Sequence, residues 1–274
     1  MQAQEPSKTA RGAAVLRAAH QLIDAPRIFD DPLAVRILDG LPESPVATDP
    51  KHFDSDGLIR LRASVALRSR YAEDALGEAV ARGVRQYVLL GAGLDTFAYR
   101  NPYASAGLRV FEVDHPATQQ WKRERLQQVG IAIPDSLTFV AIDFESETIG
   151  AALDRAGFDR TQPAFLSWLG VTVYLTRDAV MDTLRFVQSA LAAGSEIVFS
   201  YTEAPSPYLA ARAESLGEPW KTSFDPEELA HELRALGFSN VDDLTPAEAN
   251  RRYLDHRADR LRVGSIGHLM RAHV

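Results

Sequence analysis

Two glycines and one carboxylate are the first residues whose spacing could support chemistry. Gly91 and Gly93 follow a short apolar run at residues 88–90, a pattern typical of a strand buried on both faces in a parallel sheet. Because neither glycine has a Cβ, the backbone can turn sharply there and lie close against a ligand. Asp114 ends a second apolar stretch about 20 residues further on, where α/β folds accept the hydroxyls of a ribose. This order predicts a nucleoside pocket.

The same turn argues against two common nucleotide sites. A dinucleotide fingerprint needs a third glycine, whose place is taken by Thr96, so an NAD site is disfavoured. A phosphate-binding loop would need Gly-Lys-Ser or Gly-Lys-Thr, which this region lacks. The turn could therefore hold a nucleoside or amino-acid part of a ligand, or it could be a tight strand-to-helix turn with no ligand.

An arginine on the apolar face of a predicted helix is the next candidate. Residues 58–82 show apolar side chains at three- and four-residue spacing, and Arg68 lies on that stripe. Arg70 is rotated from it by roughly 200°. A guanidinium among apolar residues needs an anionic partner, because an unpaired buried charge is costly. That partner is either a structural carboxylate or the carboxylate of a ligand. The predicted stripe consists of Leu61, Val65, Ala72, Leu76 and Ala79 or Val80.

Alternating strands and helices must position these side chains. A third strand is predicted over 137–142, and Asp143 with Phe144 stands at its end. This pair could bond an adenine amino group and cover its ring, although Asp143 could equally be a helix cap. Further strands are predicted over 164–169 and 196–201, with later ones at 238–244 and 265–274, and the intervening helices imply an α/β fold with helices on both faces of a parallel sheet.

The first 57 residues differ from this pattern. They contain a predicted helix over 9–24, then Asp31-Pro32 as a capping acid and first-turn proline. These two residues predict a second short helix that extends through Leu38, and a proline-rich loop is expected over 41–56. From the residues alone, a structural wrap and a lid over the pocket are equally open.

Composition limits the classes of function. The chain has 274 residues, a net charge of −7 and no cysteine. The negative charge argues against nucleic-acid binding, and the lack of cysteine excludes disulfides and thiolate catalysis. The seven histidines show no metal-ligand spacing. Because no apolar run approaches the roughly 20 residues of a membrane span and the N-terminus lacks a signal-peptide core, we expect a cytoplasmic protein without membrane partners. A homo-oligomer remains open.

Taken together, these motifs resemble the S-adenosylmethionine-dependent methyltransferases of the leucine carboxyl methyltransferase type. The similarity is strongest to their bacterial, largely actinobacterial, branch and covers nearly the whole chain. The motifs that carry it are Arg27-Ile-Phe-Asp-Asp-Pro32, Arg68-Ser-Arg-Tyr71, Leu90-Gly-Ala-Gly-Leu-Asp-Thr96, Phe111-Glu-Val-Asp-His-Pro116, Val173-Tyr-Leu-Thr176 and Leu244-Thr-Pro-Ala-Glu248.

The resemblance implies a Rossmann-like class I methyltransferase fold. Such a fold has a seven-stranded, mostly parallel sheet whose final strand runs antiparallel. The resemblance also implies that residues 1–57 form a helical cap or lid over the acceptor site, and that residues 58–274 form the S-adenosylmethionine-binding domain. The product would be S-adenosylhomocysteine.

Residue roles follow from the same resemblance. Arg68 would hold the carboxylate of the methionine part, in agreement with its inward position. Asp114 would accept the ribose hydroxyls. The other implied cofactor-binding residues are Gly91 and Gly93, beside the methionine part, and Asp143 and Phe144, around the adenine.

One position departs from the family. A glutamate often follows the fourth strand, where this chain has Leu169, and a leucine cannot accept a hydrogen bond or balance a sulfonium charge. We therefore expect an acceptor other than a protein's terminal leucine. The favoured function is O-methyl transfer to a carboxylate or hydroxyl of a small molecule, such as a secondary metabolite. The alternatives are a non-catalytic ligand- or partner-binding protein and an NAD(P)-linked oxidoreductase. Candidates for acceptor contact are Tyr174, Tyr201 and Glu203, and no catalytic base is assigned.

Overall fold

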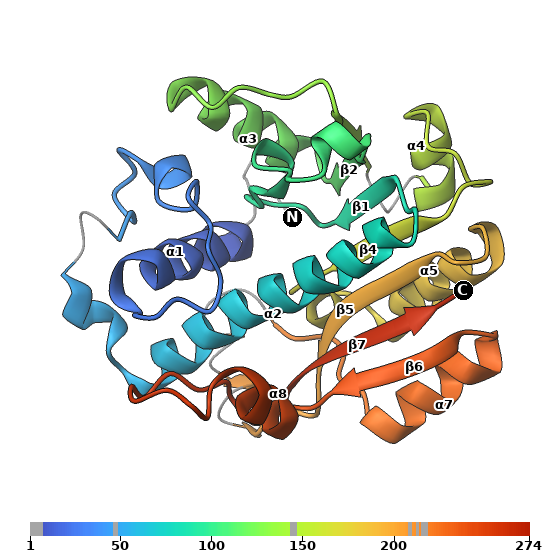
Figure 1. Cartoon of the computed structure of the whole chain (residues 1–274). Helices are drawn as coiled ribbons and strands as arrows, with labels where there is room; N and C mark the ends of the chain where they lie inside the picture. The colour runs from blue at the N-terminus through green and yellow to red at the C-terminus, as the bar shows by residue number, and fades with distance from the viewer. Residues whose placement is uncertain (1–7, 46–48, 143–146, 208–209, 212–213, 215–218) are drawn as a thin grey trace.

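A seven-stranded sheet forms the centre of the protein, in the order β3-β2-β1-β4-β5-β7-β6 (Figure 1). The structure is a computed structural model that describes residues 8–45, 49–142, 147–207, 210–211, 214 and 219–274. The strands are β1 (Gln86–Leu90), β2 (Arg109–Asp114), β3 (Leu137–Ala141), β4 (Ala164–Trp168), β5 (Glu196–Thr202), β6 (Ser239–Leu244) and β7 (Gly267–His273).

The pairing of the strands confirms the predicted class I methyltransferase sheet. β1 pairs in parallel with β2 and β4, while β7 pairs antiparallel with both β5 and β6. The chain moves outward from β1 through β2 to β3 and then returns to place β4 on the other side of β1. Open α/β sheets bind ligands at such a reversal, outside the carboxyl ends of the strands, which here are those of β1 and β4.

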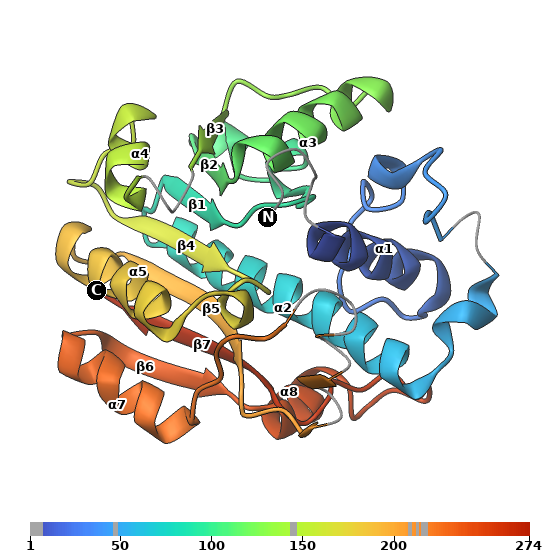
Figure 2. The same ribbon diagram turned by 180° about the vertical axis from the view of Figure 1, so that it is seen from behind.

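Helices cover both faces of the sheet, as Figures 1 and 2 show. One apolar cluster joins the strands to α2 and α8, and another joins them to α4, α5 and α7. The helices are α1 (Lys8–Ile23), α2 (Asp56–Ala81), α3 (Pro116–Gln128), α4 (Ile149–Arg155), α5 (Arg177–Ala190), α7 (Pro226–Leu236) and α8 (Pro246–Tyr253).

The N-terminal region packs beyond the carboxyl ends of the central strands. In Figure 2 the arrowheads of β1 and β4 point toward α1. A third apolar cluster joins Ala14 and Ala18 of α1 to Leu94, just after the glycine turn, and to Leu126 of α3. The predicted first helix is thus confirmed, and it lies beyond the carboxyl ends of these strands.

Three local predictions were wrong. The helix expected through Leu38 is a turn followed by a single 3-10 turn at Arg36–Leu38, because the buried Asp31 carboxylate binds tertiary partners in addition to Leu33 N. The helix expected after the glycine turn is replaced by the 3-10 turns Phe97–Tyr99 and Ala104–Ala106. Leu61 is 53% exposed, since the first turns of α2 bury a rotated stripe against α1. That stripe contains Ile59, Arg62, Ala63 and Ala66.

Candidate functional site

The glycine turn after β1 is held between two other segments. Gly91 and Gly93 have φ angles of 67° and 47°, in the left-handed region that favours glycine. A Cβ at Gly91 would lie 2.5 Å from Val171 Cγ2, and one at Gly93 would lie 2.9 Å from Ala10 Cβ. Both glycines are therefore required by close packing, against the loop after β4 and against α1.

Asp114 is fixed beside this turn. Its Oδ2 accepts a hydrogen bond from Gly93 N at 2.6 Å, and its Oδ1 accepts one from His115 N at 2.7 Å. Burial raises the pKa of Asp114, and the two backbone bonds oppose that rise. Because each carboxylate oxygen has two lone pairs, both can still accept a ligand hydroxyl. The predicted pair of Gly93 and Asp114 thus meets at the strand edge.

Arg68 points inward from α2 toward the loop after β4. Its guanidinium lies against Gly170, which has a φ of 74°, and a Cβ there would collide with Arg68 Nη1. Among the residues that the structure describes, no hydrogen-bond or ion-pair partner of Arg68 is found. Burial and then the charge of Arg17 lower the pKa of Arg68 to about 10. An inward cation without a partner is suited to receive an anionic ligand group.

Arg17 is a nearby residue that the sequence reasoning missed. It is 6% exposed on α1, its Nη2 donates to Leu94 O, and its Nε lies 2.9 Å from Asp31 Oδ2. Arg17 is therefore already paired, whereas for Arg68 the described residues show only the favourable charges of Tyr174 and Asp95, without a hydrogen bond or salt bridge. Its place among Ala14 and Ala18, at three- and one-residue spacing on the buried side of α1, is the signal that could have found it.

The structure brings four predicted cofactor residues to one edge of the sheet. Gly93 bonds to Asp114, Gly91 packs on Val171, and the adjoining Gly170 lies on Arg68. Asp143 and Phe144 lie outside the described residues.

Leu169 occupies the position where the family often has glutamate. It is partly buried against the apolar cluster on the α2 side of the sheet, which is also the side from which Arg68 approaches Gly170. Because leucine carries no charge, Leu169 does not form an ion pair with Arg68.

A second polar group lies at the same end of the sheet, further along toward β6. His268 Nε2 is 2.9 Å from Glu203 Oε1, and His268 Nδ1 is 2.8 Å from Asp243 Oδ2. The His268 side chain is 4% exposed, whereas that of Glu203 is 46% exposed. Burial disfavours the charged imidazole, but the bonds to Asp243 and Glu203 outweigh it and raise the pKa of His268. We name Glu203–His268–Asp243 the acceptor-edge triad after the prediction that Glu203 contacts the acceptor, and its accessible carboxylate is that of Glu203.

Two tyrosines predicted to contact the acceptor behave differently. Tyr201 is 1% exposed and stacks on the His268 ring at a centroid distance of 5.0 Å, so it supports the triad rather than reaching the surface. Burial, followed by the charge of Asp243, raises the pKa of Tyr201 and keeps the phenol protonated. Tyr174 lies in the 3-10 turn Thr172–Tyr174 after β4 and is partly exposed.

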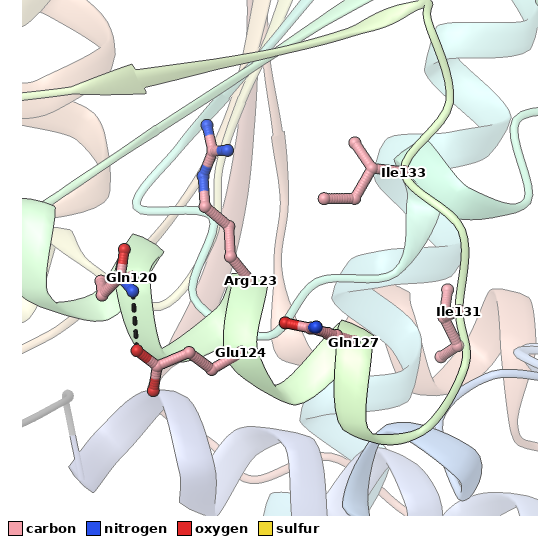
Figure 3. Close-up of a pocket in the computed structure, with 6 residues that line it drawn as sticks. All are labelled: Gln120, Arg123, Glu124, Gln127, Ile131 and Ile133. Atoms are coloured by element: carbon pink, nitrogen blue, oxygen red, sulfur yellow. Dashed lines mark hydrogen bonds between the residues drawn. The ribbon is translucent and has the colours of Figure 1, made fainter.

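A surface hollow of about 440 Å³ lies elsewhere, on the outer side of α3 (Figure 3). In it Arg123 covers the Phe139 ring at 4.0 Å, and Gln120 donates to Glu124. None of the predicted site residues lines it. The lining residues are Gln120, Arg123, Glu124, Gln127, Ile131 and Ile133.

Neither a metal site nor a membrane-spanning helix is found in the described parts of the chain. No group of three histidine or acidic side chains there could hold a metal ion, and the members of the acceptor-edge triad bond to one another instead. No helix among those residues has the length and apolar character needed to cross a membrane.

Known proteins share both the sequence and the fold. The leucine carboxyl methyltransferase family model matches residues 10–188. The chain is 32% identical to YktD of Bacillus subtilis, named as a proposed S-adenosyl-L-methionine-dependent methyltransferase, over 99% of each chain. A similarly named protein of Frankia alni is 35% identical over 70% of this chain and 68% of its own length.

Solved structures confirm the fold. A proposed methyltransferase from Thermobifida fusca superposes with a TM-score of 0.59 and 19% identity, covering 98% of both chains. The chain therefore belongs to the leucine carboxyl methyltransferase family, as a Rossmann-like class I enzyme whose cofactor is S-adenosylmethionine.

Proposed function

We propose that this methyltransferase acts on an oxygen atom of a small molecule, such as a secondary metabolite, and that Arg68 holds the carboxylate of the cofactor's methionine part. The observation that carries the cofactor assignment is the inward guanidinium of Arg68, for which the described residues provide no partner. A methionine carboxylate would supply the missing anion and offset the burial of the charge.

The other cofactor contacts follow from the strand edge. Asp114 is held by backbone N–H groups with lone pairs to spare, which suits the two hydroxyls of a ribose. Because Gly91 and Gly93 have no Cβ, the turn packs closely against its neighbours. Asp143 and Phe144 are proposed to frame the adenine, by resemblance to the family.

Bound S-adenosylmethionine supplies a methyl carbon attached to a positively charged sulfur. A new oxygen–carbon bond forms as the sulfur–carbon bond breaks, and the bonding pair stays on sulfur in S-adenosylhomocysteine. The protein's task is to align the acceptor oxygen and exclude water. A hydroxyl acceptor also has a proton to release, whereas a carboxylate does not.

The acceptor-edge triad supports a hydroxyl acceptor. Glu203 Oε1 bonds to His268, which leaves Oε2 to accept a hydrogen bond from a hydroxyl group. The triad contains two carboxylates and one imidazole, a composition that disfavours an anionic acceptor. The family's name refers to a leucine carboxyl group, so the triad distinguishes our proposal from that precedent.

Formation of S-adenosylhomocysteine from a panel of phenols, alcohols and carboxylic acids tests this proposal. We expect turnover with hydroxyl acceptors that falls about a hundredfold in Glu203→Gln, the lower end of the loss typical of one positioned proton acceptor. Glu227→Gln is the matched control, because Glu227 is exposed at the start of α7. Turnover of carboxylic acids alone would contradict the hydroxyl assignment. Cofactor binding without turnover of any compound would favour a non-catalytic ligand-binding protein.

A further inference from the structure

Asp31 is a buried carboxylate at the junction of the N-terminal region and the glycine turn. It is 1% exposed, and its Oδ2 accepts a 2.6 Å hydrogen bond from Thr96 Oγ1. The same carboxylate lies 2.9 Å from Arg17 Nε and 3.4 Å from Arg100 Nε. One side chain thus joins α1, the loop after the glycine turn and the segment that follows it.

Two of these contacts bear on residues 94–96 of the loop. Thr96 is bonded to Asp31 directly, and Arg17, which Asp31 orients, donates to Leu94 O. Between them, Asp95 uses its Oδ1 to accept Phe97 N at 2.8 Å and exerts a favourable charge on Arg68. Asp31 therefore sets the path of the loop at the methionine end of the cofactor site.

The charges around Asp31 give it a second effect. Arg17 acts electrostatically on Arg68 and lowers its pKa, so the two guanidiniums repel each other. Asp31 offsets the charge of Arg17, while Arg100 also pairs with Glu73 of α2. Without the Asp31 carboxylate, Arg17 would be left beside Arg68 with its charge uncompensated.

We infer that Asp31 is a positioning residue of the cofactor site, which binds the N-terminal region to the 94–96 loop and compensates the charge of Arg17 near Arg68. Asp31 acts through Thr96 and Arg17 and does not itself touch the cofactor. This inference rests on the proposed binding of the methionine part by Arg68. Under this inference, residues 8–45 are attached to the loop of the cofactor site and do not serve only as a cover over the acceptor.

The test compares two ligands that share an adenosine but differ in the amino-acid part. S-adenosylhomocysteine carries the carboxylate that Arg68 would bind, and 5′-methylthioadenosine lacks it. A residue that positions the methionine end should affect only the first ligand, whereas a general loss of structure should weaken both. Titration calorimetry on the full chain measures both affinities, and thermal unfolding without ligand records stability separately.

We expect Asp31→Asn to weaken S-adenosylhomocysteine about tenfold and 5′-methylthioadenosine about twofold or less, because misplaced charge and loop geometry act locally. Asp30→Asn is the matched control, since the neighbouring Asp30 side chain is 79% exposed and pairs with Arg27. Thr96→Val tests the same contact without changing charge and should weaken S-adenosylhomocysteine severalfold. Thr96→Ser keeps the hydroxyl and should restore the affinity of the unaltered chain.

Three results would overturn the inference alone: unchanged or tighter S-adenosylhomocysteine binding in Asp31→Asn, equal losses for both ligands, or Thr96→Ser behaving like Thr96→Val. Should Asp31→Asn fail to fold, the two Thr96 variants decide the matter. If the unaltered chain shows no preference for S-adenosylhomocysteine over 5′-methylthioadenosine, the proposed role of Arg68 fails as well, and this inference fails with it.

Discussion

The cofactor edge and the acceptor edge of the sheet differ in how their charges are satisfied. At the cofactor edge, Arg68 is an inward cation for which the described residues offer no partner. At the acceptor edge, His268 is bonded on both ring nitrogens, and the partly exposed Glu203 ends the chain of bonds. Under our proposal, the cofactor edge needs its ligand to complete a charge pair, whereas the acceptor edge is internally bonded and offers one carboxylate oxygen of Glu203.

This difference predicts which ligand each edge controls. Changes at the cofactor edge should alter affinity for S-adenosylhomocysteine, because an unpaired charge there contributes only when an anion binds. Changes at the acceptor edge should alter turnover or stability and leave that affinity unchanged.

Removal of the Asp114 carboxylate should have the largest effect. We expect Asp114→Ala to weaken both S-adenosylhomocysteine and 5′-methylthioadenosine about a hundredfold, since two hydrogen bonds to a charged group are lost. Both ligands carry the ribose, so both should suffer alike. Asp135→Ala, at an exposed position before β3, serves as the control, and calorimetry gives the affinities. A loss confined to one ligand would separate Asp114 from the ribose.

A methyl group at Gly170 should have a smaller effect on the same edge. Gly170→Ala places a Cβ against Arg68 Nη1, so the guanidinium must move, and we expect S-adenosylhomocysteine to bind about tenfold more weakly. Gly107→Ala is a matched control, because Gly107 also has a positive φ, 83°, but nothing lies within 4 Å of the added atom. Both variants should lose similar stability from backbone strain. Equal affinities in the two would contradict the placement of Arg68.

The hydrogen bonds of His268 at the acceptor edge should make the stability of the folded protein depend on pH. Burial opposes the charged form of His268, but Asp243 and Glu203 raise its pKa above 6.5 in the folded state. The folded protein then holds a proton that the unfolded chain releases, so the stabilisation is complete below pH 6.5 and is lost as pH rises through the folded pKa. Urea unfolding across this range should show the decline, and His268→Gln should flatten it. A profile unchanged by the substitution would contradict the ion-paired triad.

Glu203→Gln should have the smallest effect on cofactor binding. We expect its affinity for S-adenosylhomocysteine to stay within about twofold of the unaltered chain, because separate contacts of this kind act independently. A tenfold loss in the calorimeter would show that the two edges are coupled and would remove the distinction between them.

Local signals in the sequence were sufficient where short-range chemistry decides the structure. At Asp225-Pro226 and Thr245-Pro246, an acid or threonine before a proline is typical of a helix start, and each capping side chain bonds a backbone N–H within three residues. The inward direction of Arg68 also followed from helical spacing. The same spacing was wrong for Leu61, because its place on the helix depends on how α1 packs on α2.

The acceptor-edge triad shows what the sequence could not give. His268 and Asp243 lie 25 residues apart, and His268 and Glu203 lie 65 apart. Only the antiparallel placement of β7 between β5 and β6 brings these side chains together. The contact between Asp31 and Thr96 could not be predicted either. The two residues lie 65 positions apart, and no periodic pattern in the sequence indicates the contact.

The role of Arg68 is tested most directly by the preference for S-adenosylhomocysteine over 5′-methylthioadenosine, measured by calorimetry in the unaltered chain and in Arg68→Ala. Arg70→Ala is the control, since Arg70 is exposed and pairs with Asp74 on the surface of the same helix. We predict a strong preference in the unaltered chain and in Arg70→Ala, and a loss of about a hundredfold in Arg68→Ala for S-adenosylhomocysteine alone. A preference that survives in Arg68→Ala, or no binding of S-adenosylhomocysteine to the unaltered chain, would contradict the proposed role of Arg68.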